Sequence, residues 1–395
     1  MLADLDNLRF VADADVHKGG RLAGHLRRDA AGVVAFSYSA GYDGAAVAST
    51  LPLDGGTFAR PGGGLPPFFA GLLPEGHRLS VLRRATKTSM DDELTLLLAV
   101  GADTPGDVQV VPAGESPTTP APLVSARPGE LDFAALTDAP DLHGIPGVQA
   151  KASATMLTVP VAFGAAGAIL KIDPPGYPHL VANEAAHLVA ARQLRIPVAR
   201  AAVVHDRNGV PGLLVQRFDR AVPAPAAPTT RLAMEDASQA LNILPAAKYA
   251  VAAEDAVLAL TRLTKAPAVA ARNFYLQFVF AWLTGNGDLH AKNVAVLADP
   301  QGGFVASPVY DIPCTALYGD MTLALPVAGR TKNLRLRHWD EFADSIGLPR
   351  KAARSANASA LKAAGRVVLA SLPFEGSPLH GAEREIRHRR GELAD

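Results

Sequence analysis

Cysteine is almost missing from this chain of 395 residues, in which Cys314 is the single representative. One cysteine cannot form a disulfide within the chain, and proteins of oxidising compartments commonly rely on such bonds. We therefore expect a reducing compartment, the cytoplasm. Net charge is missing too, because 38 Lys and Arg residues balance 38 Asp and Glu residues. Without net charge, no global field attracts the chain to nucleic acid or to anionic lipid.

Long apolar segments are also absent. The first ten residues, MLADLDNLRF, lack a basic stretch followed by an apolar one, so we expect no secretion signal. No apolar run free of charge and Pro reaches the roughly 18 residues of a membrane-spanning helix. The sequence therefore predicts no membrane span and no membrane partner.

Several signatures of enzyme sites do not occur. The sequence has no HExxH and no paired cysteines, which argues against a zinc site. It has no GxSxG, which argues against an α/β-hydrolase. It also has no GxxxxGK followed by Ser or Thr, which argues against a P-loop nucleotide site.

The composition that remains is globular, with 49% hydrophobic and 19% charged residues, and the length suits two or three folded units. The segment ESPTTPAPLVSARPGE is rich in Pro, Ser and Thr, so it is the best candidate for a linker, with a plain solvated connection as the alternative. We predict four parts: a β-rich first domain with helices over 1–114, a linker over 115–130, a β-rich part over 131–228 and a helical part over 229–395.

Alternation, helical periodicity and turn residues predict the elements of the first domain. They are strands at 32–40 and 46–53, a helix broken at Pro-Glu-Gly over 66–84, a short amphipathic helix over 92–103 that ends at Gly101, and a strand at 107–114.

The later elements alternate first and then become helical. They are strands at 151–160 and 165–173, a helix at 179–196, a hairpin of strands at 197–207 and 212–220, mostly helix from Thr229 to Trp282, short strands at 294–297 and 303–312, and helices from about Asn333. A β-rich lobe thus precedes a helical lobe, which predicts an α+β fold with two lobes.

The segment 284–297, TGNGDLHAKNVAVL, places four polar side chains of different chemistry between two apolar runs. The carboxylate of Asp288 can take a proton from a hydroxyl held in line with a phosphate. The oxygens of Asn293 and of Asp311, which follows a short strand, suit Mg²⁺. Lys292 would bring positive charge near phosphoryl oxygens, and His290 would hold the loop by hydrogen bonds. The alternative is that Asp288 caps a helix and His290 is a paired core histidine.

Lys171 lies on a predicted strand among apolar residues. An ammonium that points into the interior needs an anionic partner, and Glu184 on the next helix could provide one. The alternative is a surface lysine on an edge strand. The turn GIPGVQAK at 144–151 could present N–H groups to an anion, although such Gly-Pro turns are common.

Several blocks together resemble the HipA family of bacterial serine/threonine kinases, the toxins of HipBA-type toxin–antitoxin pairs. The blocks, which span roughly 65–315, are PFFAGLLPEG, LLLAVGADTPGDVQVVP, GVQAK, LKIDPPGYPHLVANEAAHLVAARQLRIPVA, VQRFDR, RLAMEDASQALNILPAAKY, NGDLHAKN and SPVYDI. The resemblance implies a protein-kinase-like fold whose nucleotide-binding part is the β-rich segment 131–228.

The resemblance also implies roles for single residues. Asp288 would be the catalytic base, Asn293 and Asp311 would hold Mg²⁺, and Lys171 would bind the α and β phosphates of ATP. The other nucleotide-binding residues implied are the phosphate-covering turn Pro146, Gly147, Val148, Gln149, Ala150 and Lys151, the adenine-facing strand Gln216, Arg217 and Phe218, and His290, Ala291, Lys292 and Tyr310. The implied partners are a HipB-like helix-turn-helix antitoxin, DNA only through that antitoxin, and a protein substrate such as an aminoacyl-tRNA synthetase.

The sequence departs from the family pattern at three positions. Gln216 replaces a Glu, Met234 replaces a Gln, and Gly144 stands where autophosphorylated members carry a Ser. Ser153 lies nearby but does not align, so the resemblance implies control by a partner rather than by that switch.

Two other functions stay open, an inactive binding module that acts as operon corepressor and a small-molecule kinase. The basic RHRR at 387–390 could touch DNA phosphates or belong to a solvated helical tail.

Overall fold

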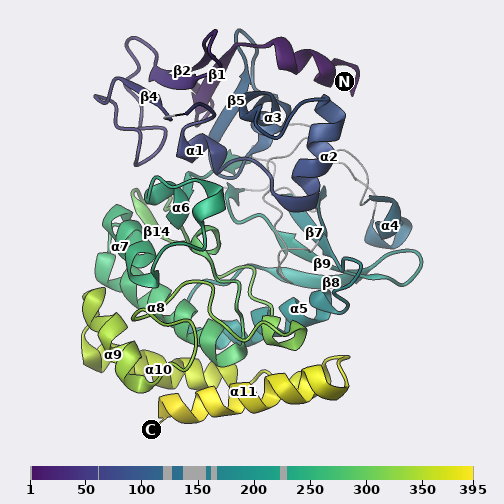
Figure 1. The fold of residues 1–395 in the computed structure, drawn as a ribbon, viewed down its shortest axis with the longest axis vertical. Helices are drawn as coiled ribbons and strands as arrows, with labels where there is room; N and C mark the ends of the chain where they lie inside the picture. Colours follow the sequence, from purple (N-terminus) through teal and green to yellow (C-terminus); the bar gives the residue numbers. More distant parts are fainter. Residues whose placement is uncertain are drawn as a thin grey trace.

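The N-terminal part of the chain is built on a five-stranded antiparallel sheet (Figure 1). The structure, a computed structural model, describes residues 2–60, 62–118, 127–136, 157–161, 167–222 and 229–394. The strands, in the spatial order β4-β3-β2-β1-β5, are β1 (Asp13–Lys18), β2 (Arg21–Arg28), β3 (Val34–Tyr38), β4 (Thr57–Ala59) and β5 (Val108–Pro112). Gly19 and Gly20 make the β1–β2 turn with φ of 56° and 81°, which suits glycine at both positions.

Short helices pack on this sheet and close its core. They are η1 (Leu2–Phe10), α1 (Pro67–Ala70), α2 (Gly76–Thr86), α3 (Glu93–Val100) and η2 (Gly101–Asp103). The predicted break between α1 and α2 and the end of α3 at Gly101 are confirmed. The amphipathic character predicted for α3 is wrong, because every residue from Leu94 to Val100 is buried. This helix lies between the sheet and its neighbours, so no face of it meets water.

The strand prediction for this domain was partly wrong. The segment 46–53 forms only an isolated bridge between Ala48 and Leu51, because no neighbouring strand pairs with it. The strands predicted at 32–40 and 107–114 are confirmed as β3 and β5, whereas β1 and β2 were not predicted.

A second antiparallel sheet lies in the middle of the molecule. Its strands, in the order β6-β7-β9-β8, are β6 (Leu157–Val161), β7 (Ala168–Ile172), β8 (Ala201–His205) and β9 (Pro211–Gln216). The predicted strand at 165–173 and the hairpin are confirmed, and residues 151–156 of the first predicted strand lie outside the described residues. On one face, Leu170, Ile172 and Leu214 pack on Phe133 of α4 (Phe133–Leu136). Lys171 points to the opposite face, because successive side chains alternate along a strand.

The predicted helix at 179–196 is confirmed as α5 (Leu180–Ala191), extended by η5 (Arg192–Leu194). Its residues Leu180, Val181 and Leu188 are buried in the same core as Leu213 of β9. Helix α5 therefore covers the middle sheet and presents Asn183, Glu184 and His187, which are almost fully buried, toward the interior.

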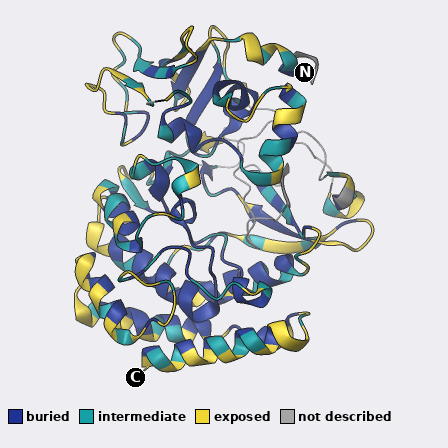
Figure 2. Ribbon diagram, in the orientation of Figure 1, coloured by how far each residue is buried: buried dark blue, intermediate teal, exposed yellow. Residues whose placement is uncertain are grey.

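The C-terminal lobe is helical, as predicted. Its helices are α6 (Ala237–Ala240), α7 (Ala253–Leu263), α8 (Pro267–Thr284), α9 (Leu336–Ser345), α10 (Arg350–Ala364) and α11 (Gly376–Ala394). Helix α8 is buried from Phe274 to Thr284, and Figure 2 shows it as the dark centre of the lobe, while the outer faces of the surrounding helices are exposed. Pro267 begins the helix, and Gly285 ends it in a left-handed conformation with φ of 73°.

Short strands connect this lobe to the rest. The sheet β12-β13-β14 pairs β12 (Met234–Asp236), β13 (Ala295–Ala298) and β14 (Phe304–Ala306), and β10 (Arg220–Ala221) pairs with β11 (Thr230–Arg231). The predicted short strand at 294–297 is confirmed as β13, whereas the one predicted at 303–312 forms only over Phe304–Ala306, as β14. In the described part of the chain, no helix has the length and apolarity that crossing a membrane would need.

A buried ion cluster fixes the N-terminal domain to the middle sheet. Asp103 of η2 binds Arg217 and Arg220 at 2.7 Å each, and Asp219 binds the same two guanidinium groups at 2.8 and 2.7 Å. All four side chains are at most 8% exposed. Each of the four charges meets at least two opposite charges, so the cluster holds the end of β9 and the N-terminal domain in one geometry.

The basic C-terminal segment is a helix, α11, that lies along the bottom of the molecule in Figure 1. Arg389 is 1% exposed, stacks on the Trp282 ring with 3.8 Å to its centroid, and donates to the Trp282 carbonyl at 3.1 Å. Arg390 donates to the Ala364 carbonyl at 2.7 Å. These two arginines therefore attach the helix to the lobe instead of forming a free basic surface.

Candidate active site

The segment 284–297 runs from the last residue of α8 through a loop into β13, and all of its residues are buried. Asp288 is 0% exposed, and its N–H donates to the side-chain oxygen of Asn286 at 2.8 Å. A Cβ at Gly287 would lie 2.4 Å from the Thr322 carbonyl oxygen, so this position requires glycine. The loop continues through η7 (Ala291–Asn293). Buried peptide groups and a required glycine thus hold the predicted catalytic loop in place.

Two neighbours fix the position of Asp288, one through its carboxylate and one through its main-chain carbonyl. The Tyr249 hydroxyl donates to Asp288 Oδ1 at 2.8 Å, and the Asn293 amide donates to the Asp288 carbonyl at 3.0 Å. Asp288 does not cap a helix, since α8 ends at Gly285. The structure therefore contradicts the alternative in which Asp288 is a helix cap.

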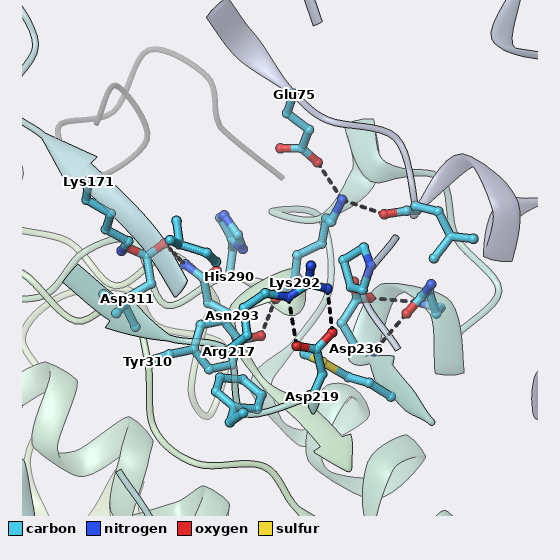
Figure 3. A pocket seen from close by; sticks show the side chains of 18 of the residues that line it. Glu75, Lys171, Arg217, Asp219, Asp236, His290, Lys292, Asn293, Tyr310 and Asp311 are labelled. Atoms are coloured by element: carbon cyan, nitrogen blue, oxygen red, sulfur yellow. Dashed lines mark hydrogen bonds and ion pairs between the residues drawn. The ribbon is translucent and has the colours of Figure 1, made fainter. Parts of the chain in front are cut away.

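Lys171 lies at the centre of a second charged group. Its ammonium binds both oxygens of Glu184 at 2.7 and 2.8 Å and Asp311 Oδ1 at 2.8 Å (Figure 3). The Lys171 side chain is 12% exposed and that of Glu184 is 1% exposed. The predicted pairing of Lys171 with Glu184 is confirmed, and the alternative of a surface lysine is wrong.

This second group holds two carboxylates and a single ammonium. Burial and the neighbouring Asp311 raise the pKa of Glu184 to about 7, although Lys171 opposes them. Burial alone would lower the pKa of Lys171, but Asp311 and Glu184 outweigh it and raise the pKa above its ordinary value. The ammonium is therefore charged at neutral pH, and the group carries more negative than positive charge when both carboxylates are ionised. A cation beside Asp311 would remove this excess.

Asn293 and Asp311 lie next to one another beside this group. The Asn293 amide nitrogen is 3.3 Å from Asp311 Oδ2. Asp311 has φ of 54°, a left-handed conformation that costs energy for a residue other than glycine and that aims its carboxylate at Lys171. Among the described residues, no three His, Cys, Asp or Glu side chains form a complete metal site. An Asn and an Asp oxygen suit Mg²⁺, which takes few protein ligands and completes its shell with phosphates and water.

These groups open on a cavity between the N-terminal domain, the middle sheet and the helical lobe (Figure 3). Its lining residues are Gly71, Leu72, Glu75, Pro105, Ile169, Lys171, Glu184, Val215, Gln216, Arg217, Phe218, Asp219, Met234, Asp236, Gln239, His290, Lys292, Asn293, Tyr310 and Asp311. Nine of the predicted site residues are in this set, namely Lys171, Gln216, Arg217, Phe218, His290, Lys292, Asn293, Tyr310 and Asp311. Asp288 and Ala291 lie in the loop behind the lining.

The strand end Gln216–Phe218 forms one wall, as predicted. The Arg217 side chain turns away into the buried ion cluster, so this residue offers its backbone to the cavity. However, the peptide N–H of Gln216 donates to the Arg200 carbonyl at 2.8 Å and that of Arg217 to the Gly167 carbonyl at 3.2 Å. These two amides would have to leave their partners to meet a ligand.

His290 and Lys292 line the cavity, but they do so differently from the prediction. The ring nitrogens of His290 have no hydrogen-bond partner among the described residues, and the ring lies against Tyr249 with 5.0 Å between centroids. Burial and nearby Lys248 hold the pKa of His290 well below its ordinary value. The prediction that this side chain holds the loop by hydrogen bonds was wrong; its backbone carbonyl does so, by accepting from Asn293 N–H at 2.9 Å.

The Lys292 ammonium turns toward the N-terminal domain. It lies 2.8 Å from Glu75 Oε1 and donates to the Gly71 carbonyl at 3.0 Å. Its carbonyl oxygen accepts from the Tyr310 hydroxyl at 2.7 Å. Lys292 therefore joins three parts of the chain at the cavity wall.

Sequence reasoning gave no role to three residues that contact the loop, Glu75, Lys248 and Tyr249. Their segments, LPEG and AAKY, were available as blocks of the resemblance. Nothing in the sequence around Lys248 and Tyr249 indicates which residues they contact. Glu75 follows a proline, and this pattern indicates a helix break rather than a role in the site. The phosphate turn Pro146–Lys151, Gly144 and Ser153 lie outside the described residues.

Comparisons with known proteins agree with this architecture. The family model described as HipA-like C-terminal domain matches residues 143–368, and that described as HipA N-terminal domain matches residues 14–111. A protein of Sinorhizobium fredii named "Putative kinase Y4mE" is 30% identical over 362 residues, which are 84% of this chain and 85% of that protein.

Two further relatives come from Shewanella oneidensis. Its serine/threonine-protein kinase toxin HipA is 27% identical over 374 residues, which are 85% of this chain and 84% of the toxin. A solved complex of HipA, HipB and operator DNA, from a toxin–antitoxin system, contains a chain with a TM-score of 0.72 at 24% identity, covering 96% of this chain and 95% of that one. The fold is therefore α+β and matches that of HipA. With both parts of the chain matched, this protein belongs to the HipA family.

Proposed function

We propose that this chain is an ATP-dependent serine/threonine protein kinase that transfers the γ-phosphate of ATP to a hydroxyl of another protein. The observation that carries this proposal is the Lys171 ammonium, held between Glu184 and Asp311 at 2.7–2.8 Å on the wall of a cavity that Asn293 also lines. A strand lysine paired with a helix glutamate, next to an Asp and an Asn, is the arrangement that protein kinases use to hold Mg–ATP.

Asn293 and Asp311 would hold Mg²⁺, because their oxygens are of the type it prefers and both side chains line the cavity. When bound, this ion would neutralise charge on the phosphates. The chain's own contribution is position and charge. Lys171 would meet the phosphates from the sheet side, with Glu184 fixing its ammonium, while Gln216–Phe218 would face the adenine.

Asp288 would accept the proton of the acceptor hydroxyl as the phosphate is transferred. Asp288 is fully buried here, so the acceptor hydroxyl would have to enter the interior to reach its carboxylate. The Tyr249 hydroxyl, which donates to Asp288 Oδ1 at 2.8 Å, would orient this carboxylate for the acceptor. A base oriented by a second group in this way is a general device of catalytic sites.

A protein of the HipB type is the proposed partner, with DNA reached through it. The related Shewanella chain is found with HipB and operator DNA, which supports this assembly. The proposed acceptor is a component of translation such as an aminoacyl-tRNA synthetase, with growth arrest as the consequence and neutralisation by the antitoxin as its control. Co-purification with the product of an adjacent helix-turn-helix gene tests the partner.

The first experiment incubates the purified chain with γ-labelled ATP and Mg²⁺, alone and with a bacterial extract as acceptor. We expect label on protein, and we expect its loss when EDTA removes the divalent cation, because Asn293 and Asp311 alone leave the phosphate charge unbalanced. Label that persists in EDTA would contradict the magnesium role. Nucleotide binding without any transfer would favour the inactive binding module.

Tyr249→Phe is expected to slow transfer while ATP affinity stays within about threefold, because the lost hydroxyl touches the base and not the nucleotide cavity. The removed hydrogen bond is the one at 2.8 Å to Asp288 Oδ1. We expect a roughly 10-fold fall in kcat, in line with the loss of an orienting group. The measurement is kcat and KM for ATP, and an unchanged kcat would show that Tyr249 does not orient Asp288.

A further inference from the structure

The N-terminal domain contributes directly to the cavity through Gly71, Leu72, Glu75 and Pro105. Glu75 immediately precedes α2 and is the single ionisable side chain among these four. Figure 3 shows it reaching from the N-terminal domain toward Lys292. The N-terminal domain therefore places one carboxylate, that of Glu75, at the edge of a site formed mainly by the middle sheet and the helical lobe.

Two lysines from the other side of the interface bind this carboxylate. Glu75 Oε2 accepts from Lys248 at 2.5 Å, and Glu75 Oε1 lies 2.8 Å from Lys292 Nζ. The side chains are 12% exposed for Glu75, 1% for Lys248 and 4% for Lys292. Burial favours the neutral form of Glu75, but Lys292 and Lys248 outweigh it and lower the pKa to about 2. Glu75 is therefore an anion between two cations, nearly all hidden from water.

Both lysines belong to the machinery around the base. Lys292 precedes Asn293, and Lys248 precedes Tyr249, which holds Asp288. The Lys248 carbonyl also accepts from Ala291 N–H in the loop at 3.1 Å. Glu75 thus fastens the catalytic loop and the segment that orients its base to the same point of the N-terminal domain.

We propose that Glu75 is a positioning residue for phosphoryl transfer, so that the N-terminal domain forms part of the active site. This inference rests on the proposed kinase function. The two ammonium groups have Glu75 as their shared counter-ion, and without it they would repel one another inside the protein. Lys292 and Lys248 would then shift, and with them Asn293 and the Tyr249–Asp288 pair. ATP would still meet Lys171 and β9, which Glu75 does not touch.

The test compares the full-length chain with Glu75→Gln, which keeps the shape of the side chain and removes its charge. ATP hydrolysis or self-labelling with Mg²⁺ gives kcat and KM, and a fluorescent ATP analogue gives affinity. We expect kcat to fall roughly 10- to 100-fold, the effect of a small displacement of reacting groups, with affinity changed less than about threefold. A lower kcat with nearly unchanged ATP affinity distinguishes a positioning role of Glu75 from a general loss of structure.

Glu235→Gln is the matched control. Glu235 is also a buried carboxylate that joins the two parts, accepting from Ser49 N–H at 2.9 Å and from its hydroxyl at 2.6 Å, but it does not line the cavity. We expect this variant to keep the kcat of the parent. If Glu75→Gln does not fold, the double variant Glu75→Gln/Lys248→Gln removes one charge of each sign, and it should fold and still show the reduced kcat.

The outcomes separate the two proposals. Parent-like kcat in Glu75→Gln, or in the folded double variant, overturns the role of Glu75 and leaves the kinase function intact. An equal fall in Glu75→Gln and Glu235→Gln overturns it as well, since the effect would then belong to the interface in general. A parent chain that neither binds nor hydrolyses ATP overturns the kinase function and this inference together.

Discussion

Asp288→Asn is expected to remove phosphate transfer while the protein stays folded and binds ATP. The substitution keeps the shape of the side chain, but an amide cannot take a proton from the acceptor hydroxyl. Loss of a general base typically costs roughly 100- to 10,000-fold in rate. The measurement is label transferred from γ-labelled ATP, with nucleotide affinity and thermal unfolding measured on the same preparation.

The geometry makes this prediction specific. Asp288 lies behind the cavity lining, so its replacement leaves the lining residues Lys171, Asn293 and Asp311 untouched. Its main-chain bonds to Asn286 and Asn293 do not depend on the carboxylate either. Asp320→Asn is a suitable control, because Asp320 lies near the same loop but its carboxylate accepts from Thr322. Transfer by Asp288→Asn at a rate within about threefold of the parent would exclude the role of base.

Two parts of the candidate site could be predicted from the sequence, because residues near one another in the chain indicate them. Polar residues between two apolar runs at 284–297 must be buried, and buried polar groups occur where they are paired or used. The same reasoning paired Lys171 with Glu184, because an ammonium on an apolar strand needs an anion. Both predictions depend on the burial of these polar residues, which the apolar residues on either side of them in the sequence indicate.

Contacts between residues that lie far apart in the sequence could not be predicted in this way. Glu75 and Lys248 are 173 residues apart, and their pairing follows from the docking of one domain on another. Strands β1 and β2 were missed because DADVHK and RLAGHLRR are rich in charge. Their apolar residues Ala14, Val16 and Leu26 face the core, while Asp15 and His25 bind one another at 2.8 Å on the other face. Conversely, the apolar segment 46–53 has strand-forming residues but no partner strand.

The charged side chains of the site form two groups, one with an excess of negative charge and one with an excess of positive charge. Around Lys171, two carboxylates share one ammonium, and around Glu75, two ammonium groups share one carboxylate. The first group would attract a divalent cation, and the second would attract anionic phosphate or stay fixed to its counter-ion. Phosphoryl transfer needs both kinds of field within one cavity, because a cation and a polyanion must bind together.

Lys171→Met is expected to abolish transfer, to weaken ATP binding and to destabilise the fold. The ammonium is the partner of Glu184 and of Asp311, and removal of one partner from a buried ion pair costs about 3–5 kcal/mol. The loss should grow between pH 6 and pH 8. The folded-state pKa of Glu184, already about 7 beside the ammonium, would rise further without it. A raised carboxyl pKa stabilises the fold at low pH, and this contribution is lost as pH rises.

The double variant Lys171→Met/Glu184→Gln separates stability from function. It removes the two charges together, so urea unfolding should recover most of the stability that Lys171→Met loses, and the recovery should be greater at pH 8 than at pH 6. Phosphate transfer should stay absent, because no ammonium faces the phosphates and Asp311 has lost its partner from the sheet. If the double variant transferred phosphate at the parent rate, Lys171 would be a structural cation only, and the nucleotide would have to be held by other groups of the cavity. If instead the single variant were as stable as the parent at pH 8, the ion pair with Glu184 would not carry the buried charge that its 2.7 Å contact indicates.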